Sequence, residues 1–172
     1  CQVVLTASIT TPAKAQKSKT AQKMTKKIIA ATLPNVYGER VDDATINLSY
    51  ADVYKLHAVY ESADISTPPV SPALTISNST GTFTIGEIIT GSSSGATGRV
   101  IDNTTSATTV EYVVLAGIFT TNDNITGGTS TYTATVTAVT SGDRNITANW
   151  LLDTGQRDSF YDLGRGSRRP DA

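Results

Sequence analysis

The residues best suited to nucleophilic, redox or metal chemistry are scarce in this chain of 172 residues, which has one cysteine, Cys1, and one histidine, His57. A zinc site built from these residue types needs about four ligands, so this class of site is excluded. A Ser-His-Asp triad would have to use His57. On a strand, Glu61 would share its face at about 13 Å, too far for a catalytic pair. We therefore expect a structural or surface histidine, no hydrolase or other enzymatic activity, no catalytic residue and no cofactor.

The densest group of acids consists of Asp153, Asp158 and Asp162. Three carboxylates near a turn could bind calcium through oxygen ligands. Their spacing matches no calcium-binding loop, and Arg157 supplies a competing cation. A turn closed by salt bridges is therefore the favoured interpretation, and no metal site is predicted. The residues expected to make structural turn or assembly contacts are Asp153, Arg157, Asp158, Tyr161 and Asp162.

Two other acids, Glu87 and Asp123, lie 36 residues apart in similar sequence contexts. A pair of carboxylates could in principle hydrolyse a glycosidic bond. An internal repeat explains the pair more simply, because equivalent positions of a repeat carry similar residues. We therefore interpret both acids as polar residues that precede a turn.

Six of the seven lysines lie between Lys14 and Lys27, before the first acid, Glu39. Such a basic stretch could contact phosphates. It lacks the interleaved aromatic residues on which single-stranded bases stack, so we predict no nucleic-acid partner. A solvated loop or a contact with an acidic neighbour is the favoured interpretation. Asn-x-Ser/Thr sequons, which we attribute to chance at this Ser/Thr content, occur at Asn47, Asn78, Asn103, Asn124 and Asn145.

The composition favours strands over helices. There are 29 Thr, 16 Ser and 13 Gly, and charged residues make up 17% of the chain, against about 25% in an average soluble domain. Threonine favours strands and glycine favours turns. The net charge of −1 provides no overall attraction to nucleic acid or to a membrane. No apolar run reaches the roughly 18 residues of a membrane span. We predict an all-β protein.

The sequence pattern places the strands unevenly along the chain. Residues 33–50 contain Pro34, Gly38 and an Asp pair, which predict turns. Residues 67–72 hold three prolines and predict a linker, because proline cannot continue a sheet ladder. Strands are predicted at residues 3–10, 28–33, 52–62, 108–115 and 145–152. The Arg/Gly tail with Arg165, Arg168 and Arg169 is either a docking strand or a frayed end.

An internal repeat follows the linker: FTIGEIITG at 83–91 matches FTTNDNITG at 119–127. The match extends to Ser94 over Ser130. Two copies are too few for a solenoid. Two strand-turn-strand units related by a pseudo-twofold axis could close into a small barrel without free edges. Its predicted core comprises Phe83, Ile85, Ile89, Val100, Val113, Leu115, Phe119, Ile125 and Val136.

The domain organisation follows from the repeat. We predict a small barrel at residues 73–141, inserted into a β-sandwich-like host domain made of residues 1–66 and 143–172. The host domain is expected to be incomplete, because no apolar run follows Leu163. The chain starts with cysteine and shows no signal-peptide pattern. We therefore expect a piece of a longer polypeptide or a processed one.

Three stretches together resemble one family: DVYKLHAVYES at 52–62, the repeat segment at 83–100, and LDTGQRDSFYD at 152–162. They are similar to large virion structural proteins of contractile-tailed phages, especially phages of cyanobacteria and other marine bacteria. The resemblance spans residues 33–165. Its most specific part is the GQRDxFYD stretch, whereas the ITG…GAT pattern marks only the class of phage tail proteins. The resemblance implies a tail, baseplate or fibre protein in the virion, without catalytic residues.

Two functions remain open at this point. The first is a structural component of a phage tail that works through oligomeric β assembly, with further virion proteins as partners. The resemblance suggests a trimer, as is common for phage fibres. Unpaired strand edges predict contacts from residues 1–66 and 145–165. The linkers at 67–72 and 141–142 predict an outward-pointing barrel. The second is a carbohydrate-binding or adhesion module of a surface or secreted protein, which would bind a host-surface glycan. The only Trp lies beside two leucines, and most tyrosines lie outside the repeat, which favours the structural role.

Overall fold

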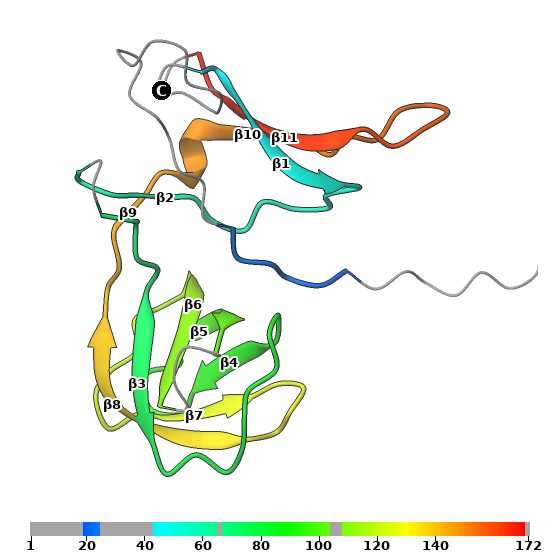
Figure 1. The fold of residues 1–172 in the computed structure, drawn as a ribbon. Helices are drawn as coiled ribbons and strands as arrows, with labels where there is room; N and C mark the ends of the chain where they lie inside the picture. The colour runs from blue at the N-terminus through cyan, green and yellow to red at the C-terminus, as the bar shows by residue number, and fades with distance from the viewer. Residues whose placement is uncertain (1–18, 25–42, 65–66, 104–107, 171–172) are drawn as a thin grey trace, which may run out of the picture.

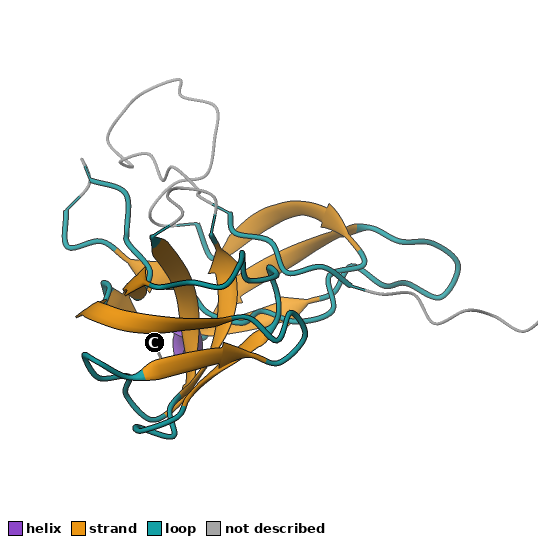
Figure 2. Cartoon of the chain, turned by 90° about the horizontal axis from the view of Figure 1, so that it is seen from below, coloured by secondary structure: helices purple, strands orange, loops and turns teal. Residues whose placement is uncertain are grey.

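A computed structural model describes residues 19–24, 43–64, 67–103 and 108–170. These residues form strands and one short 3-10 turn, so the prediction of an all-β fold is confirmed. A closed barrel occupies one end of the molecule, and a three-stranded sheet occupies the other (Figure 1). Figure 2 shows this 3-10 turn as the one helical element of the described residues. The predicted strands at residues 3–10 and 28–33 lie outside the described residues. Among those that are described, no helix is long and apolar enough to cross a membrane.

Six antiparallel strands close the barrel in the order β3-β6-β5-β4-β7-β8. Closure between β3 and β8 means that the barrel as a whole has no edge strand. The strands are β3 (Ala73–Ser77), β4 (Ile88–Gly91), β5 (Thr97–Asp102), β6 (Thr109–Ala116), β7 (Asn124–Gly127) and β8 (Thr133–Thr140).

The strand registers confirm the pseudo-twofold symmetry. Leu74 pairs with Val110, which is its own counterpart 36 residues later. Thr90 pairs with Thr126, again its own counterpart. The pseudo-twofold axis therefore passes through these two pairs. The hairpins match as well, because Thr90 pairs with Thr97 and Thr126 pairs with Thr133.

The turns before β4 and β7 have the same backbone conformation in both copies. Gly86 and its counterpart Asn122 lie in the left-handed region, with φ of 93° and 67°. Glycine and asparagine are the residues that adopt this region most readily. Each donates its amide to the opposite strand, Gly86 to Val100 and Asn122 to Val136, both at 2.8 Å. Local turn chemistry thus repeats along with the hydrophobic pattern.

Most of the predicted core is confirmed. Phe83, Ile89, Val100, Val113, Phe119, Ile125 and Val136 are all buried. Ile85 is only half-buried, and the prediction for Leu115 is wrong because 44% of this residue is exposed. The core face of β6 carries Val110 and Tyr112, so alternation turns Leu115 to the outer face. A bulge, at which Gly98 pairs with Val114 and Thr97 with Ala116, also leaves Leu115 opposite no residue of β5. Further core residues are Leu74, Ile76, Ala96, Val110, Tyr112 and Ala134.

The three-stranded sheet has the order β1-β11-β10, with strands β1 (Thr45–Ala51), β10 (Trp150–Asp153) and β11 (Leu163–Arg168). The prediction of turns at residues 33–50 is therefore wrong for residues 45–50, which belong to β1. The Arg/Gly tail is neither a docking strand nor a frayed end up to Arg168, because β11 is the central strand of this sheet. These strands stand where the sandwich-like host domain is predicted.

The strand prediction at 52–62 is largely wrong, since only β2 (Tyr60–Glu61) forms, paired with β9 (Arg144–Asn145). Hydrogen bonds hold the segment before β2 near its ends: Val53 donates to the Thr154 carbonyl at 3.1 Å, and Val59 donates to the Thr147 hydroxyl at 2.8 Å. The strand predicted at 145–152 is interrupted by a 3-10 turn, η1 (Thr147–Asn149).

Two linkers connect the barrel to the remaining strands, and they run side by side. The Val70 amide donates to the Asp143 carboxylate at 2.8 Å, and the Asp143 amide donates to the Val70 carbonyl at 2.9 Å. A Cβ atom on Gly142 would overlap the Pro72 backbone. Residues 67–72 form no strand, as predicted for a linker. The two hydrogen bonds between Val70 and Asp143 hold this linker against the second one.

Candidate functional site

A hairpin loop joins β10 to β11 and holds the residues that the sequence analysis selected. Gly155 starts this loop with φ of +78°, and its carbonyl accepts the Asp162 amide at 2.7 Å. A Cβ atom at Gly155 would overlap the Asp162 carbonyl, so only glycine fits here. The Arg157 amide donates to the Phe160 carbonyl at 3.0 Å and closes the end of the loop. In Figure 1 the loop projects beyond the sheet.

Ion pairs stiffen this loop. The Arg157 guanidinium donates to both oxygens of Asp153, at 3.0 and 2.9 Å. Asp162 lies 3.9 Å from Arg157 and 3.4 Å from Arg165. The hydrogen bonds from Arg157 lower the pKa of Asp153 to about 2. The loop is thus the predicted salt-bridged turn, in which the Arg157 guanidinium engages both Asp153 oxygens. No group of three metal-ligating side chains occurs among the described residues, and Asp158 is exposed.

Exposed aromatic side chains gather at this end of the sheet. Phe160 and Tyr161 are 60% and 63% exposed within the loop. Ala51 pairs with Leu163, which places the adjacent Tyr50 beside the base of the hairpin. We call the following residues the tip surface: Tyr50, Tyr54, Phe160, Tyr161 and Leu163. Such a concentration of exposed aromatic residues is typical of a contact surface.

Within the tip surface, only Tyr161 is among the contact residues predicted from the sequence. Phe160 directly precedes it in a polar loop, where a large apolar side chain has little to pack against; this is a signal that the sequence did contain. Tyr54 is 77% exposed, and its place beside the hairpin follows from the Val53 to Thr154 hydrogen bond. That contact joins distant parts of the chain, so no local pattern could reveal it.

Glu87 and Asp123 are buried, with 5% and 1% exposed, and each caps a turn in the other repeat. Glu87 accepts the amides of Thr129 and Ser130 at 2.9 and 2.8 Å, and the Ser130 hydroxyl at 2.8 Å. Asp123 accepts the Ser93 amide at 2.8 Å.

The hydroxyl of Ser94, the counterpart of Ser130, also donates to Asp123. The prediction of polar residues before a turn is therefore incomplete. Each acid precedes one turn and stabilises the equivalent turn of the opposite repeat.

The environment of these carboxylates determines their charge. Burial by itself would raise the pKa of Glu87, but hydrogen bonds from Ser130, Thr129 and Thr84 outweigh it and hold the pKa below its usual value. The same balance lowers the pKa of Asp123. Both are therefore ionised structural groups near neutral pH. Their oxygens are taken up by turn amides and hydroxyls, which argues against the glycosidase alternative.

His57 is partly buried, and Lys19 and Lys23 pair with acidic side chains. Burial, followed by the charges of Arg99 and Lys55, lowers the pKa of His57, so it is neutral near pH 7. Lys23 contacts Glu111 at 2.6 Å, and Lys19 pairs with Asp52. The predicted contact with acidic neighbours is thus correct for Lys19 and Lys23. The other lysines of the basic stretch lie outside the described residues.

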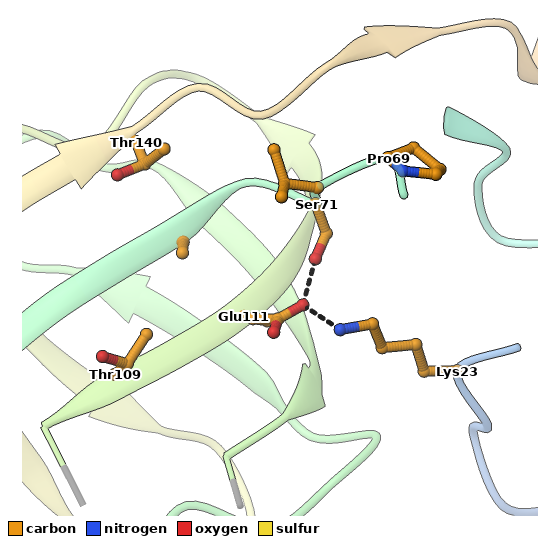
Figure 3. A pocket seen from close by; sticks show the side chains of 8 residues that line it. Lys23, Pro69, Ser71, Thr109, Glu111 and Thr140 are labelled. Carbon is orange, nitrogen blue, oxygen red and sulfur yellow. Dashed lines mark hydrogen bonds and ion pairs between the residues drawn. The ribbon is translucent and has the colours of Figure 1, made fainter. Parts of the chain in front are cut away.

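A cleft of about 250 Å³ lies where the segment around Lys23 meets the barrel (Figure 3). The Glu111 carboxylate accepts hydrogen bonds from both Lys23 and Ser71. These opposite charges neutralise one another, which leaves the cleft without a net charge to attract an ion. The cleft's remaining lining is Pro69, Val70, Ala73, Thr109 and Thr140. The exposed tip surface is therefore the stronger candidate for a functional contact.

Comparisons with protein-family models, with curated proteins and with solved structures gave no match to this chain.

Proposed function

We propose that this chain is a structural component of a bacteriophage tail, as a baseplate, fibre or tail-decorating protein, and that it acts in the virion through homo-oligomeric β assembly. It is proposed to have no enzymatic activity. A trimer is the first expectation, with other virion proteins as further partners. The proposal draws on the resemblance of three sequence stretches to such proteins, including the stretch that forms the hairpin loop.

The observation that carries the proposal is the tip surface. Phe160 and Tyr161 stand on a loop whose backbone is closed by the hydrogen bonds from Arg157 to Phe160 and from Asp162 to Gly155, so less backbone freedom is lost when the two rings are covered. Large aromatic side chains at the centre of a contact supply much of its binding energy. A stiff loop that presents two such rings suits a repeated protein–protein contact.

Sedimentation equilibrium of the full chain tests the proposal. The wild type is expected to form an oligomer, and the double variant Phe160→Ser, Tyr161→Ser is expected to be a monomer with an unchanged circular dichroism spectrum. Tyr132→Ser, which removes a barrel tyrosine that is 39% exposed, is the matched control and is expected to assemble normally. A wild type that stays monomeric at all concentrations would contradict the proposal. Antibody labelling of particles that contain the chain should mark the tail rather than the capsid.

The second candidate function is glycan binding, which the exposure of Tyr54 and Tyr161 favours, because exposed tyrosine rings can stack on sugar rings. The exposed carboxylate of Asp158 lies in the same hairpin loop as Tyr161. A glycan array probed with the full chain separates the two functions. Binding that Tyr161→Ser abolishes, in a protein that does not self-associate, would favour the adhesion module.

A further inference from the structure

Three large apolar side chains stand exposed at the end of β6 and in the turn that follows. Val114 is 47% exposed, Leu115 is 44% exposed and Ile118 is 79% exposed. We call these three residues the β6 patch. The bulge at Leu115 is what brings two consecutive exposed side chains to this position, since regular alternation would turn one of them inward.

The other half of the internal repeat shows which side chains the barrel itself requires at the positions of this patch. Thr97 pairs with Ala116 in one half, and in the other half the equivalent Thr80 amide donates to the Thr133 carbonyl at 2.9 Å. The glycine that follows also matches, because Gly117 and Gly81 both lie against the opposite turn. The segments 78–82 and 114–118 therefore occupy equivalent places in the barrel.

Equivalent places carry different side chains. Where the second half has Val114, Leu115 and Ile118, the first half has Asn78, Ser79 and Thr82. The first half closes its side of the barrel with polar residues, so closure does not require apolar side chains at these positions. The β6 patch therefore has a role outside the barrel, because an exposed apolar cluster is stabilised when another surface covers it.

We propose that the β6 patch binds the same patch on a second copy of this chain. No charged residue occurs between Glu111 and Asp123, so two identical patches meet without electrostatic repulsion. A twofold contact is self-complementary by symmetry. The choice of a second copy rests on the proposed function, which places identical chains side by side.

The patch is small against the roughly 800 Å² that each partner buries in a stable complex. A twofold contact cannot join the threefold-related copies of one trimer. It therefore serves as an auxiliary contact between two trimers, where three such contacts act together.

Site-specific crosslinking tests this contact. The full chain with Cys1→Ser and Leu115→Cys carries a single thiol in the patch, because Cys1 is its only native cysteine. A short bismaleimide is expected to yield a covalent dimer at high protein concentration. Ser79→Cys in the same background is the matched control from the equivalent position, and its dimer yield is expected to be at least fivefold lower. Equal yields from the two variants, or no dimer from Leu115→Cys at any concentration, would overturn the proposal.

A second variant separates this contact from barrel folding and from the tip surface. Replacing the patch by its polar counterparts, Val114→Asn, Leu115→Ser and Ile118→Thr, is expected to keep the thermal unfolding of the barrel while weakening self-association severalfold. The Phe160→Ser, Tyr161→Ser protein with Cys1→Ser and Leu115→Cys should still crosslink at high concentration. If it does, the β6 contact forms independently of the tip surface, so a failure of the tip-surface proposal would not count against the β6 patch. Unchanged self-association after the patch replacement would refute it.

Discussion

Glu87 and Asp123 show how a charged residue can be part of a barrel core. Glu87 lies beside Gly127, and Asp123 lies beside Gly91. A Cβ atom at either glycine would overlap the carboxylate, so the lack of a side chain there leaves room for the acid. The serine that completes each cap lies three residues after that glycine. Each half of the barrel therefore carries an acid, a glycine and a serine at the same spacing, and its acid accepts hydrogen bonds from the turn of the other half. The two halves of the barrel are joined by these bonds as well as by apolar packing.

The first prediction concerns the caps. Asp123→Ala should lower the free energy of unfolding by about 1–3 kcal/mol, because it leaves buried turn amides and the Ser94 hydroxyl without an acceptor. Urea unfolding of the full chain measures this change. Asp158→Ala, at an exposed hairpin position, is the control and should change stability by less than about 0.5 kcal/mol. A loss for Asp123→Ala no larger than the control would show that the cap does not matter.

The second prediction is a pH dependence. The folded-state pKa values of Glu87 and Asp123 are lowered, so both contribute stability above the unfolded carboxyl pKa of about 4. That contribution is lost as the pH falls below about 4 and through the lowered values. Urea midpoints between about pH 7 and pH 2 should therefore fall steeply at the acid end. The double variant Glu87→Gln, Asp123→Asn should show a flatter profile; an unchanged profile would count against this origin.

The third prediction uses a size exchange between the repeats. In one half, Gly98 lies against the Tyr112 ring. In the other half, Ala134 stands at the position of Gly98 and Ile76 at the position of Tyr112, so the small residue is larger and the large residue is smaller. Gly98→Ala should destabilise the barrel by about 1–3 kcal/mol, because its Cβ atom would overlap the ring. Adding Tyr112→Ile, which recreates the other half's combination, should restore part of that loss. Thermal unfolding of the single and double variants tests this, and additive losses would disprove the exchange.

At the scale of elements, β11 is the clearest case of a strand formed through tertiary contacts. Gly164 and Gly166 lie in its interior, and glycine is a poor strand former. The strand nevertheless lies between β1 and β10, because its glycines let other groups approach. Val53 packs over Gly164, and the Trp150 ring lies over Gly166, with the Arg168 guanidinium 5.6 Å from the ring centroid.

The fourth prediction separates these two glycines. Gly164→Ala should destabilise the sheet, because a Cβ atom there would overlap the Val53 side chain and lie 3.3 Å from the Tyr50 carbonyl oxygen. Gly166→Ala should be tolerated, because its Cβ atom would make ordinary contact with Trp150 at 3.4 Å. Trp150 fluorescence during urea unfolding reports on the sheet, as it is the only tryptophan. The same midpoint for both variants would be evidence against the packing described.

At the scale of the whole molecule, the barrel and the three-stranded sheet differ in whether they have edge strands. The barrel closes on itself, whereas β1 and β10 are outer strands within the described part of the sheet. The paired linkers at Val70 and Asp143 hold the two parts together without extending either sheet. Local opening should therefore differ between the two parts.

The fifth prediction is measured by hydrogen exchange on the full chain. Amides of the barrel core strands, such as those of Ile89 and Ile125, should exchange more slowly than those of β1 and β10. The difference should shrink when the protein assembles through the tip surface, since assembly restrains the sheet. Equal protection of both parts in dilute solution would contradict this expectation.

The sequence by itself determined the barrel, and it did so for a local reason. Phe83 and Phe119, the turns at Gly86 and Asn122, and the Ile-Thr-Gly runs are short-range signals, and their repetition at one offset predicted two equivalent units. The hydrophobic period and the turn residues act within a few positions, so they are legible without a structure. The Asp153–Arg157 turn was predictable for the same reason.

Only the tertiary structure decided the rest. The cross-repeat role of Glu87 and Asp123, the exposure of Leu115 at a bulge, and the central place of β11 all depend on partners far away in the chain. Residues 52–62 show the converse, since a strong alternating pattern mostly failed to become a strand. Alternation describes which faces a strand would have; a neighbour with free amides and carbonyls is what makes it part of a sheet.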